Sequence, residues 1–178
     1  MDSEQLKKFR EGDHATFNRI MEQYQKPIYY FIYRMTGNAT DAEDLTQDTF
    51  VKAYLERENF RGESAVNTWI YRIAANLTKN HLRWHSIRRY ATLDAVLEFF
   101  SGESGENPVA EREILEKRLL RFVQQLPARQ RSVFILKYYN GLSHEEIAHI
   151  LEISLSASKT NFHYAVKSLK EIADKNHE

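Results

Sequence analysis

The chain has 178 residues, and its 25 lysines and arginines balance its 25 aspartates and glutamates, for a formal net charge of zero. With 42% apolar and 28% charged residues it can build a packed core, so we expect one ordinary domain or two small ones rather than a disordered chain. The absence of cysteine excludes disulfide bridges, a thiol nucleophile and cysteine-based zinc sites, and it fits a reducing cytoplasm. No run of about 18 apolar residues occurs, and no apolar stretch follows the charged N-terminus, so we expect neither membrane insertion nor a signal peptide.

The zero net charge is a sum of three unlike segments. Residues 1–90 hold 14 basic and 12 acidic side chains, residues 91–116 hold one and seven, and residues 117–178 hold ten and six, which gives +2, −6 and +4. The acidic segment also contains Gly102, Gly105 and Pro108 among Ser, Glu and Asn residues, a typical linker composition. We therefore expect an N-terminal domain at 1–90, an acidic linker at 91–112 and a C-terminal domain at 113–178. A single domain with a long surface loop is the alternative.

Helical periodicity dominates the N-terminal segment, and sustained strand-like alternation is absent from the sequence. Apolar residues at steps of three and four predict a helix over 13–35, which Gly37 and Asn38 end. Thr40 followed by Glu43 is a capping-box pattern and predicts a second helix from there to about 58. Residues 59–67 form a predicted loop around Gly62, and a third helix follows from about 68 to 89.

The C-terminal segment is equally helical, so the predicted fold is all-α. Helices are expected over 113–125 and 128–139, followed by Gly141 in a left-handed conformation. Ser143 and Glu146 form a second capping-box pattern that starts a short helix, and residues 152–154 break it before a last helix. In this last helix we expect four apolar side chains to face the core, namely Leu155, Phe162, Val166 and Leu169.

The acidic start of the second helix is the first candidate site. Carboxylates at a helix N-terminus complement the helix dipole, which explains Asp41 and Glu43. Asp44 and Asp48 are four residues apart and repel each other, so together with Gln47 they indicate a surface for a basic partner. A divalent metal is a weaker interpretation, because no third ligand cluster accompanies these carboxylates.

The basic third helix is the second candidate site. Its Asn76, Lys79, Asn80 and Arg83 follow i, i+3, i+4, i+7 and share one face, so two amides lie between two cations that could bind bases and phosphates. An ordinary solvated face is the alternative. Trp69, near the start of this helix, is interpreted as core packing rather than as a wedge that separates DNA strands.

Residues 143–170 have a helix-turn-helix pattern, the third candidate site. The last helix leaves six polar side chains on its outer side, of the kinds that bind base edges and phosphates. They are Ser156, Lys159, Thr160, His163, Tyr164 and Lys167. A plain helical hairpin is the alternative. The sequence contains no phosphate-binding glycine loop and no nucleophile elbow, so we predict no catalytic residue, metal or cofactor.

Two stretches together resemble a known family. The segments DAEDLTQDTFVKAY (41–54) and FRGESAVNTWIYRIAANLTKNHL (60–82) are similar to region 2 of bacterial sigma factors of the extracytoplasmic-function (ECF) group of the sigma-70 family. LPARQRSVFILKYYNGLSHEEIAHILEIS (126–154) is similar to region 4. Region 2, a linker and region 4 make up that family's architecture, so the resemblance covers nearly the whole chain.

The resemblance implies a role for each candidate surface. Asp44, Gln47 and Asp48 match the surface for the β′ clamp helices of core RNA polymerase, with the β flap as a further polymerase contact. The segment that captures an unpaired base of the −10 promoter element corresponds to Arg61, Gly62, Glu63, Ser64, Ala65, Val66 and Asn67. Asn76, Lys79, Asn80 and Arg83 match the helix beside the melted strand and upstream duplex, and the last helix matches the reader of the −35 element. An anti-sigma factor is a further implied partner.

The sequence departs from the family pattern in the last helix. The family usually has an apolar residue where Ser158 stands and arginines where Asn161 and Tyr164 stand, so the phosphate contribution to −35 binding should be weaker. The resemblance implies a non-enzymatic sigma factor that directs core RNA polymerase to promoters and opens DNA, in a stress or envelope response, with its acidic linker running inside the polymerase. The alternative is a stand-alone helix-turn-helix regulator, with 1–90 as a sensor or dimer module.

Overall fold

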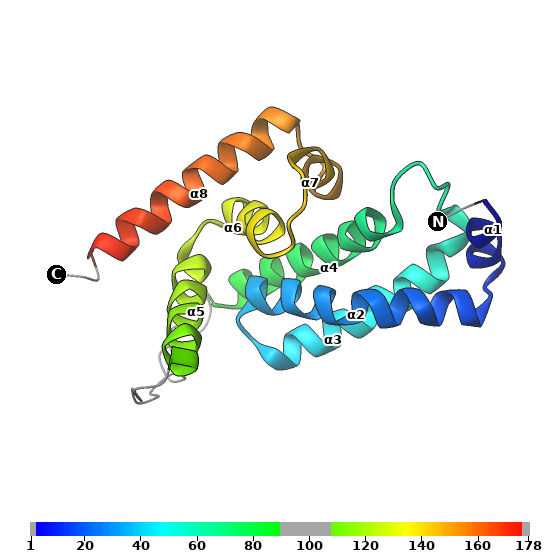
Figure 1. The fold of residues 1–178 in the computed structure, drawn as a ribbon, viewed down its shortest axis with the longest axis horizontal. Helices are drawn as coiled ribbons and strands as arrows, with labels where there is room; N and C mark the ends of the chain where they lie inside the picture. The colour runs from blue at the N-terminus through cyan, green and yellow to red at the C-terminus, as the bar shows by residue number, and fades with distance from the viewer. Residues whose placement is uncertain (1–2, 90–107, 176–178) are drawn as a thin grey trace.

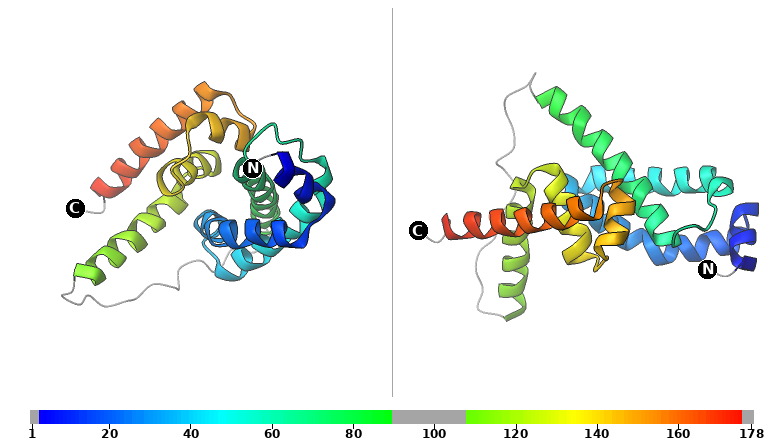
Figure 2. Two further views of the ribbon diagram at one scale, coloured as in Figure 1. Left: turned by 45° about the vertical axis from the view of Figure 1, so that its right-hand side comes forward. Right: turned by 90° about the horizontal axis from the view of Figure 1, so that it is seen from above.

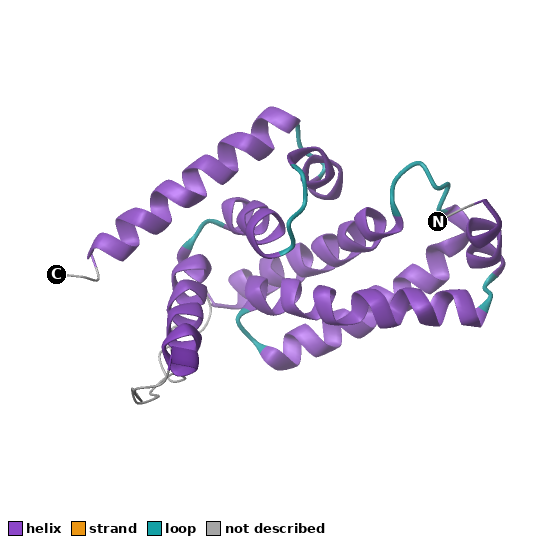
Figure 3. Ribbon diagram, in the orientation of Figure 1, coloured by secondary structure: helices purple, strands orange, loops and turns teal. Residues whose placement is uncertain are grey.

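The computed structural model describes residues 3–89 and 108–175, and within these ranges every regular element is a helix (Figures 1 and 3). The N-terminal half contains α1 (Ser3–Glu11), α2 (His14–Thr36), α3 (Ala39–Glu56), the short 3-10 helix η1 (Arg57–Asn59) and α4 (Val66–Arg89). The C-terminal half contains α5 (Pro108–Gln125), α6 (Ala128–Phe134), the π-helical segment η2 (Ile135–Tyr139), α7 (His144–Leu151) and α8 (Leu155–Lys175). The predicted all-α fold class is confirmed.

Side-chain and glycine caps set the ends of α2 and α3. Asp13 Oδ2 accepts a hydrogen bond from the Thr16 N–H at 2.7 Å at the start of α2, and Gly37, with φ 75°, ends the helix. Asn38 then caps α3, because its Oδ1 accepts from the Asp41 N–H at 3.1 Å. The predicted capping box of Thr40 and Glu43 is therefore wrong. An Asn two residues earlier already satisfies the first free N–H groups.

An aromatic cluster closes the N-terminal bundle where α1 meets the start of α4. Phe9 lies 6.1 Å from Phe17, 5.8 Å from Phe60 and 5.9 Å from Trp69, measured between ring centroids. Trp69 is 6% exposed and also packs on Phe60 at 5.0 Å. The interpretation of Trp69 as core packing is therefore confirmed, and the position of α4 depends on this contact.

The helix-turn-helix has the predicted capping box. The Glu146 N–H donates to Ser143 Oγ at 3.1 Å, and the Ser143 N–H donates to Glu146 Oε2 at 2.8 Å. Glu152 takes a left-handed conformation, with φ 54°, and ends α7 before the turn into α8. The predicted break at 152–154 is confirmed, and so is the left-handed Gly141, with φ 67°.

Two expectations for the C-terminal half are wrong. Leu155, the first residue of α8, is 38% exposed and is therefore not a core residue. Helix α5 begins at Pro108 rather than at 113, a favourable first position for proline, so residues 108–112 of the expected linker are helical. Residues 91–107 of that linker lie outside the described part of the chain.

The two halves pack against each other. Helix α7 lies on α4, and α5 lies on α2 (Figure 1). Asn140 Nδ2 donates to the Tyr71 hydroxyl at 2.7 Å, and the Arg34 guanidinium carbon lies 4.1 Å from the centroid of the Tyr139 ring. Burial in this interface raises the pKa of Tyr71 to about 12, so its hydroxyl stays protonated.

Arg131 links the halves through backbone carbonyls. Its Nη1 donates to the Met35 carbonyl at 2.7 Å, at the C-terminal end of α2. Its Nη2 donates to the carbonyls of Gln124 and Leu126, which flank the turn between α5 and α6. One side chain therefore satisfies free carbonyls of two helix ends, one in each half.

Candidate nucleic-acid and partner interface

The acidic surface lies on the outer side of α3. Asp44, Gln47 and Asp48 are all exposed, whereas Leu45, Thr46 and Thr49 on the opposite side are buried. Both buried threonine hydroxyls donate to the backbone carbonyl four residues earlier at 2.6 Å, so the inner side needs no polar partner from another helix. Among the described residues, no cation forms an ion pair with Asp44 or Asp48. The carboxylates are therefore available to a basic partner.

An apolar extension of this surface was missed by the sequence analysis. Val51 is 59% exposed and Leu55 is 70% exposed, seven and eleven residues after Asp44 and so on the same side of α3. The spacing 44, 48, 51, 55 is visible in the sequence and could have found it. Gln47 also lines a groove of about 310 Å³ between α2 and α3, together with Tyr29, Tyr30 and Glu43.

The segment between η1 and α4 holds the first predicted DNA-binding residues. The first five, 61–65, are exposed, while Val66 and Asn67 are half-buried in the first turn of α4. Gly62 has φ 74°, and a Cβ at this position would lie 2.7 Å from Leu6 Cδ2. Only glycine therefore fits, both for its backbone conformation and for the close approach of α1.

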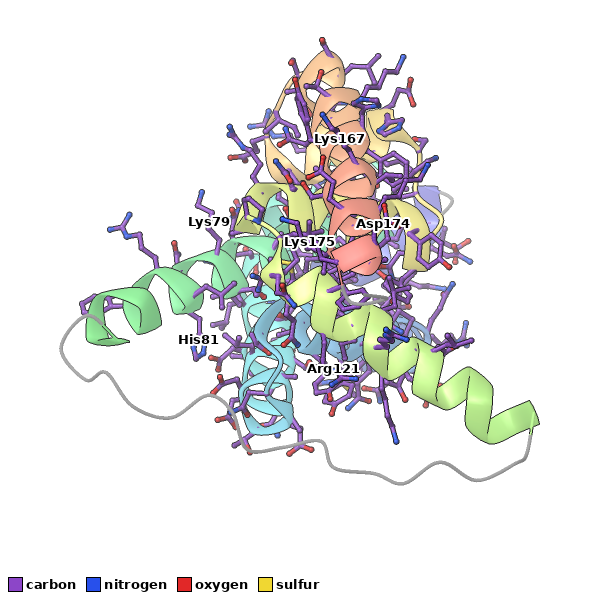
Figure 4. All side chains as sticks on the ribbon, turned by 90° about the vertical axis from the view of Figure 1, so that its left-hand side faces the viewer. Lys79, His81, Arg121, Lys167, Asp174 and Lys175 are labelled. Carbon is purple, nitrogen blue, oxygen red and sulfur yellow. The ribbon has the colours of Figure 1, made fainter. Side chains whose placement is uncertain are left out.

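The predicted basic face of α4 exists as one exposed surface. Asn76, Lys79, Asn80 and Arg83 are all exposed, while Ala74 and Thr78 on the other side are fully buried. Figure 4 shows Lys79 and His81 on opposite sides of the helix. The four residues therefore face away from the bundle, with two amides between two cations.

His81 orients α4 from its inner side. Its Nε2 lies 3.0 Å from Asp41 Oδ2, at the N-terminal turn of α3, and both side chains are largely covered. This contact removes Asp41 from the acidic surface. The contact lies on the side of α4 away from Lys79, and the buried Ile70, Ile73 and Ala74 set which side of the helix faces the bundle (Figure 4).

The last helix presents the six predicted DNA-facing side chains. Ser156, Lys159, Thr160, His163, Tyr164 and Lys167 are all exposed on α8. Tyr164 is 49% exposed, and its ring lies 5.7 Å from that of His163. Lys167, labelled in Figure 4, lies 4.0 Å from Glu171. The surface is thus richer in hydrogen-bonding groups than in free positive charge.

The buried Ser158 explains one departure from the family pattern. Ser158 is fully buried, and its Oγ lies 2.9 Å from His144 Nδ1, between the two helices of the helix-turn-helix. The His144 ring also packs on Phe162, with centroids 5.7 Å apart. A polar contact therefore lies where the family resemblance led us to expect an apolar residue. Burial first, and then Lys137 and Lys159, lower the pKa of His144.

Asn161 is turned toward its own helix. Its Nδ2 donates to the Ala157 carbonyl at 2.7 Å, and the residue is half-buried. The sequence analysis noted Asn161 only as a missing arginine, and this contact removes its amide from the exposed surface.

Two further findings concern other classes of site. Within residues 3–89 and 108–175, no three His, Asp or Glu side chains gather as metal ligands would. In the same ranges, none of the helices is long and apolar enough to cross a membrane.

Known proteins resemble the chain over nearly its whole length. The family model Sigma-70 region 2 matches residues 20–87, and the model Sigma-70, region 4 matches residues 116–174. The chain is 32% identical to the ECF RNA polymerase sigma factor SigW of Bacillus subtilis, covering 96% of each chain. It is 34% identical to the RNA polymerase sigma-H factor of Pseudomonas aeruginosa, covering 94% of this chain and 91% of that one.

Solved structures share the fold. The chain superposes on CnrH, in complex with the cytosolic domain of CnrY, with a TM-score of 0.73, 20% identity and 96% coverage of each chain. It superposes on the sigma factor RpoE of Bartonella quintana, in complex with the anti-sigma factor NepR, with a TM-score of 0.71 and 20% identity. That second match covers 89% of this chain and 96% of the other.

Proposed function

The chain belongs to the ECF group of the sigma-70 family of RNA polymerase sigma factors, and from that premise we propose how its surfaces divide the work of initiation. As a sigma factor it binds core RNA polymerase, directs it to promoters and promotes DNA opening. The observation that carries the division is the outward-facing row of amides and cations on α4, on the side opposite the His81–Asp41 contact. The same bundle thus presents an acidic helix and a basic helix as separate surfaces.

The acidic surface of α3 binds the β′ clamp helices of the polymerase. Asp44 and Asp48 supply unpaired carboxylates for basic side chains, and Gln47 supplies an amide. Val51 and Leu55 add apolar area at the far end of the same side. The groove between α2 and α3 adds two tyrosine rings and two carboxylates beside one lysine, and we include it in the surface for a basic partner; its charged and aromatic lining residues are Glu22, Lys26, Tyr29, Tyr30 and Glu43.

The segment from Arg61 to Asn67 captures an unpaired base of the −10 element. Flipping a nucleobase out of the stack costs a few kcal/mol, so its capture needs a loop of fixed shape that is held by the surrounding structure. The contact of Gly62 with Leu6 and the buried Phe60 hold this segment in place. Asn76, Lys79, Asn80 and Arg83 then bind the strand and duplex next to it.

The six exposed residues of α8 read the −35 element in the major groove. A second helix of a helix-turn-helix presents its outer side to base edges. Domain assignments follow from these roles. Residues 1–90 form region 2, residues 91–107 connect the regions, and the C-terminal region 4 begins with α5 at Pro108.

We assign no catalytic step to the chain itself. Its exposed groups suit binding, and the polymerase supplies the chemistry of RNA synthesis. An anti-sigma factor is a further proposed partner, supported by the structural neighbour RpoE, a sigma factor solved in complex with the anti-sigma factor NepR. The place of action is the cytoplasm, where RNA polymerase acts.

Gel filtration with core RNA polymerase, followed by run-off transcription, tests the proposal. The chain should elute with the core enzyme, and the complex should transcribe from promoters that core enzyme alone ignores. Sequencing of the transcribed promoters identifies the −10 and −35 elements. Tight binding to promoter duplex without polymerase, with no activation of core enzyme, would instead indicate the stand-alone regulator.

A further inference from the structure

Trp84 lies on the surface of α4 and is 66% exposed. The other tryptophan, Trp69, lies near the start of the same helix, and it is only 6% exposed because it packs in the aromatic cluster. The right-hand view of Figure 2 shows the C-terminal half of α4 projecting beyond α2 and α3. A single exposed ring is common on protein surfaces, so the inference depends on the neighbours of Trp84 along α4.

The position of Trp84 continues the row of amides on α4. Asn76, Asn80 and Trp84 follow i, i+4, i+8, so Trp84 lies one turn beyond Asn80 and about 6 Å further along the helix. It lies about 25 Å from Asn67, at the rise of a regular α-helix. That length corresponds to about seven steps of B-form DNA.

The charge of this helix selects nucleic acid as the partner. Between Glu63 and Asp94 the chain contains no carboxylate and five cations, which are Arg72, Lys79, Arg83, Arg88 and Arg89. A polyanion is therefore attracted along the whole of α4. Tryptophan adds a flat apolar face and one N–H donor, a combination that suits the apolar edge of a deoxyribose and a phosphate oxygen.

We propose that Trp84 forms the upstream end of the DNA contact, packing on the deoxyriboses of the duplex and donating its indole N–H to a phosphate oxygen. The proposal rests on the assignment of α4 to promoter DNA made above. Its distance from the loop that captures the unpaired base places Trp84 at duplex rather than at separated strands. The contact would hold the duplex edge against α4 while the downstream strands separate.

The first experiment measures binding of the reconstituted holoenzyme to two DNA forks that lack a −35 element. One fork keeps the duplex upstream of the −10 element, and the other is trimmed at that edge. Trp84→Ala should weaken binding to the first fork about tenfold, within the range that aromatic contacts to nucleic acid give, and leave the second unchanged. Trp84→Phe keeps the ring and should recover most of the loss.

Two readouts separate a ring contact from a charge contact. Hydroxyl-radical cleavage measures how far the protein shields each deoxyribose from solvent. With Trp84→Ala, the DNA should lose this protection at the upstream edge alone. The slope of log affinity against log salt concentration should stay unchanged for Trp84→Ala and fall by about 1 for Lys79→Ala. Tyr138→Ala, which removes a 59% exposed ring in the C-terminal half, is the matched control and should change neither readout.

Each contrary outcome has a distinct meaning. If Lys79→Ala weakens both forks and Trp84→Ala weakens neither, α4 binds DNA but Trp84 does not contact it. If Trp84→Ala weakens binding to core enzyme, the ring belongs to a polymerase contact and the proposal is wrong. If neither variant changes binding, the assignment of α4 to DNA fails as well.

Discussion

The two helices that we propose to face DNA, one in each half of the molecule, differ in chemistry. On α4, five cations occur in a stretch of 30 residues without a carboxylate, and the exposed face combines Lys79 and Arg83 with amides. On α8, hydroxyls, an imidazole and a phenol stand beside Lys159 and Lys167, and Lys167 lies against Glu171. Charge attracts any DNA, whereas hydrogen-bonding groups distinguish bases. Helix α4 is thus suited to hold DNA of any sequence, and α8 is suited to choose a sequence.

The halves also differ in what supports the exposed helix. Helix α4 is fixed by the aromatic cluster at Trp69 and by the His81–Asp41 contact to α3. Helix α8 rests on α7 through Ser158 and His144, a buried polar contact. Both supports therefore include a histidine, and they differ in that α4 also has the aromatic cluster whereas the Ser158 hydroxyl on α8 is fully buried.

The largest expected effect comes from Asp44→Lys, on the acidic surface of the N-terminal half. A cation facing a basic partner costs several kcal/mol, so affinity for core polymerase should fall about a hundredfold. A titration of labelled protein with core enzyme measures it. Asp174→Lys, at an exposed acid in the C-terminal half, is the control and should bind normally. Normal binding by Asp44→Lys would remove α3 from the polymerase contact.

The next largest effect should come from removing two positive charges from α4. Lys79→Ala with Arg83→Ala should weaken holoenzyme binding to all promoters alike and reduce the slope against log salt by about 2. Filter binding at several salt concentrations gives the slope. Lys175→Ala at the end of α8 should leave it unchanged. A loss confined to some promoter sequences would show that α4 reads bases more than phosphates.

An exchange of Lys159 and Thr160 should alter which −35 sequences α8 prefers. A misplaced base contact costs about 1 to 3 kcal/mol, so preference among −35 sequences should shift about tenfold or more. Transcription from templates that vary only in the −35 element measures the shift. Affinity for core polymerase serves as the control and should not change. An unaltered ranking of templates would contradict the assignment of α8 to the −35 element.

Two glycines test the two halves with the same substitution. Gly62→Ala should cost about 2 kcal/mol of stability, because it combines left-handed strain with a contact to Leu6. Gly141→Ala should cost about 1 kcal/mol, because φ is 67° but no atom lies within 4 Å of the new Cβ. Urea unfolding of each variant gives the two values. Equal losses would show that α1 moves away freely from the loop.

The smallest effect is the pH dependence that His144 gives to the C-terminal half. Its pKa is lowered in the folded protein, so the unfolded chain binds the proton more tightly. The free energy of unfolding should therefore rise with pH up to about 6.5, the ordinary histidine value, and this contribution should be constant above it. Urea unfolding at pH 5, 6 and 7.5 measures the trend. His144→Ala should flatten it, and an unchanged trend would exclude His144 as its source.

Local patterns predicted most helices and all the exposed candidate residues on α4 and α8. They predicted the capping box at Ser143 and Glu146 because both partners lie within one turn. The same pattern at Thr40 and Glu43 misled, because Asn38 already caps a helix that begins at Ala39, and local spacing does not rank the two candidate caps. Leu155 was misplaced for a similar reason, since the direction of a first-turn side chain depends on the preceding turn.

The features that escaped prediction depend on contacts between distant segments. Asn140 meets Tyr71 across 69 residues, and Arg131 meets the Met35 carbonyl across 96. Helical periodicity describes one helix at a time and carries no information on such pairs. The buried Ser158 was noted only as a departure from the family, because its partner His144 lies on another helix.

The hydrogen bonds of Arg131 between the two halves affect whether halves from different relatives can be joined in one chain. On the side of α2 its partner is a backbone carbonyl, which any residue at position 35 would supply. At Gly37, whose φ is 75°, a Cβ would lie 2.5 Å from the end of the Gln124 side chain, which would then have to shift. A chimera that joins an N-terminal half and a C-terminal half from different relatives should therefore keep the Arg131–Met35 bond wherever the C-terminal half supplies Arg131, whatever residue stands at position 35.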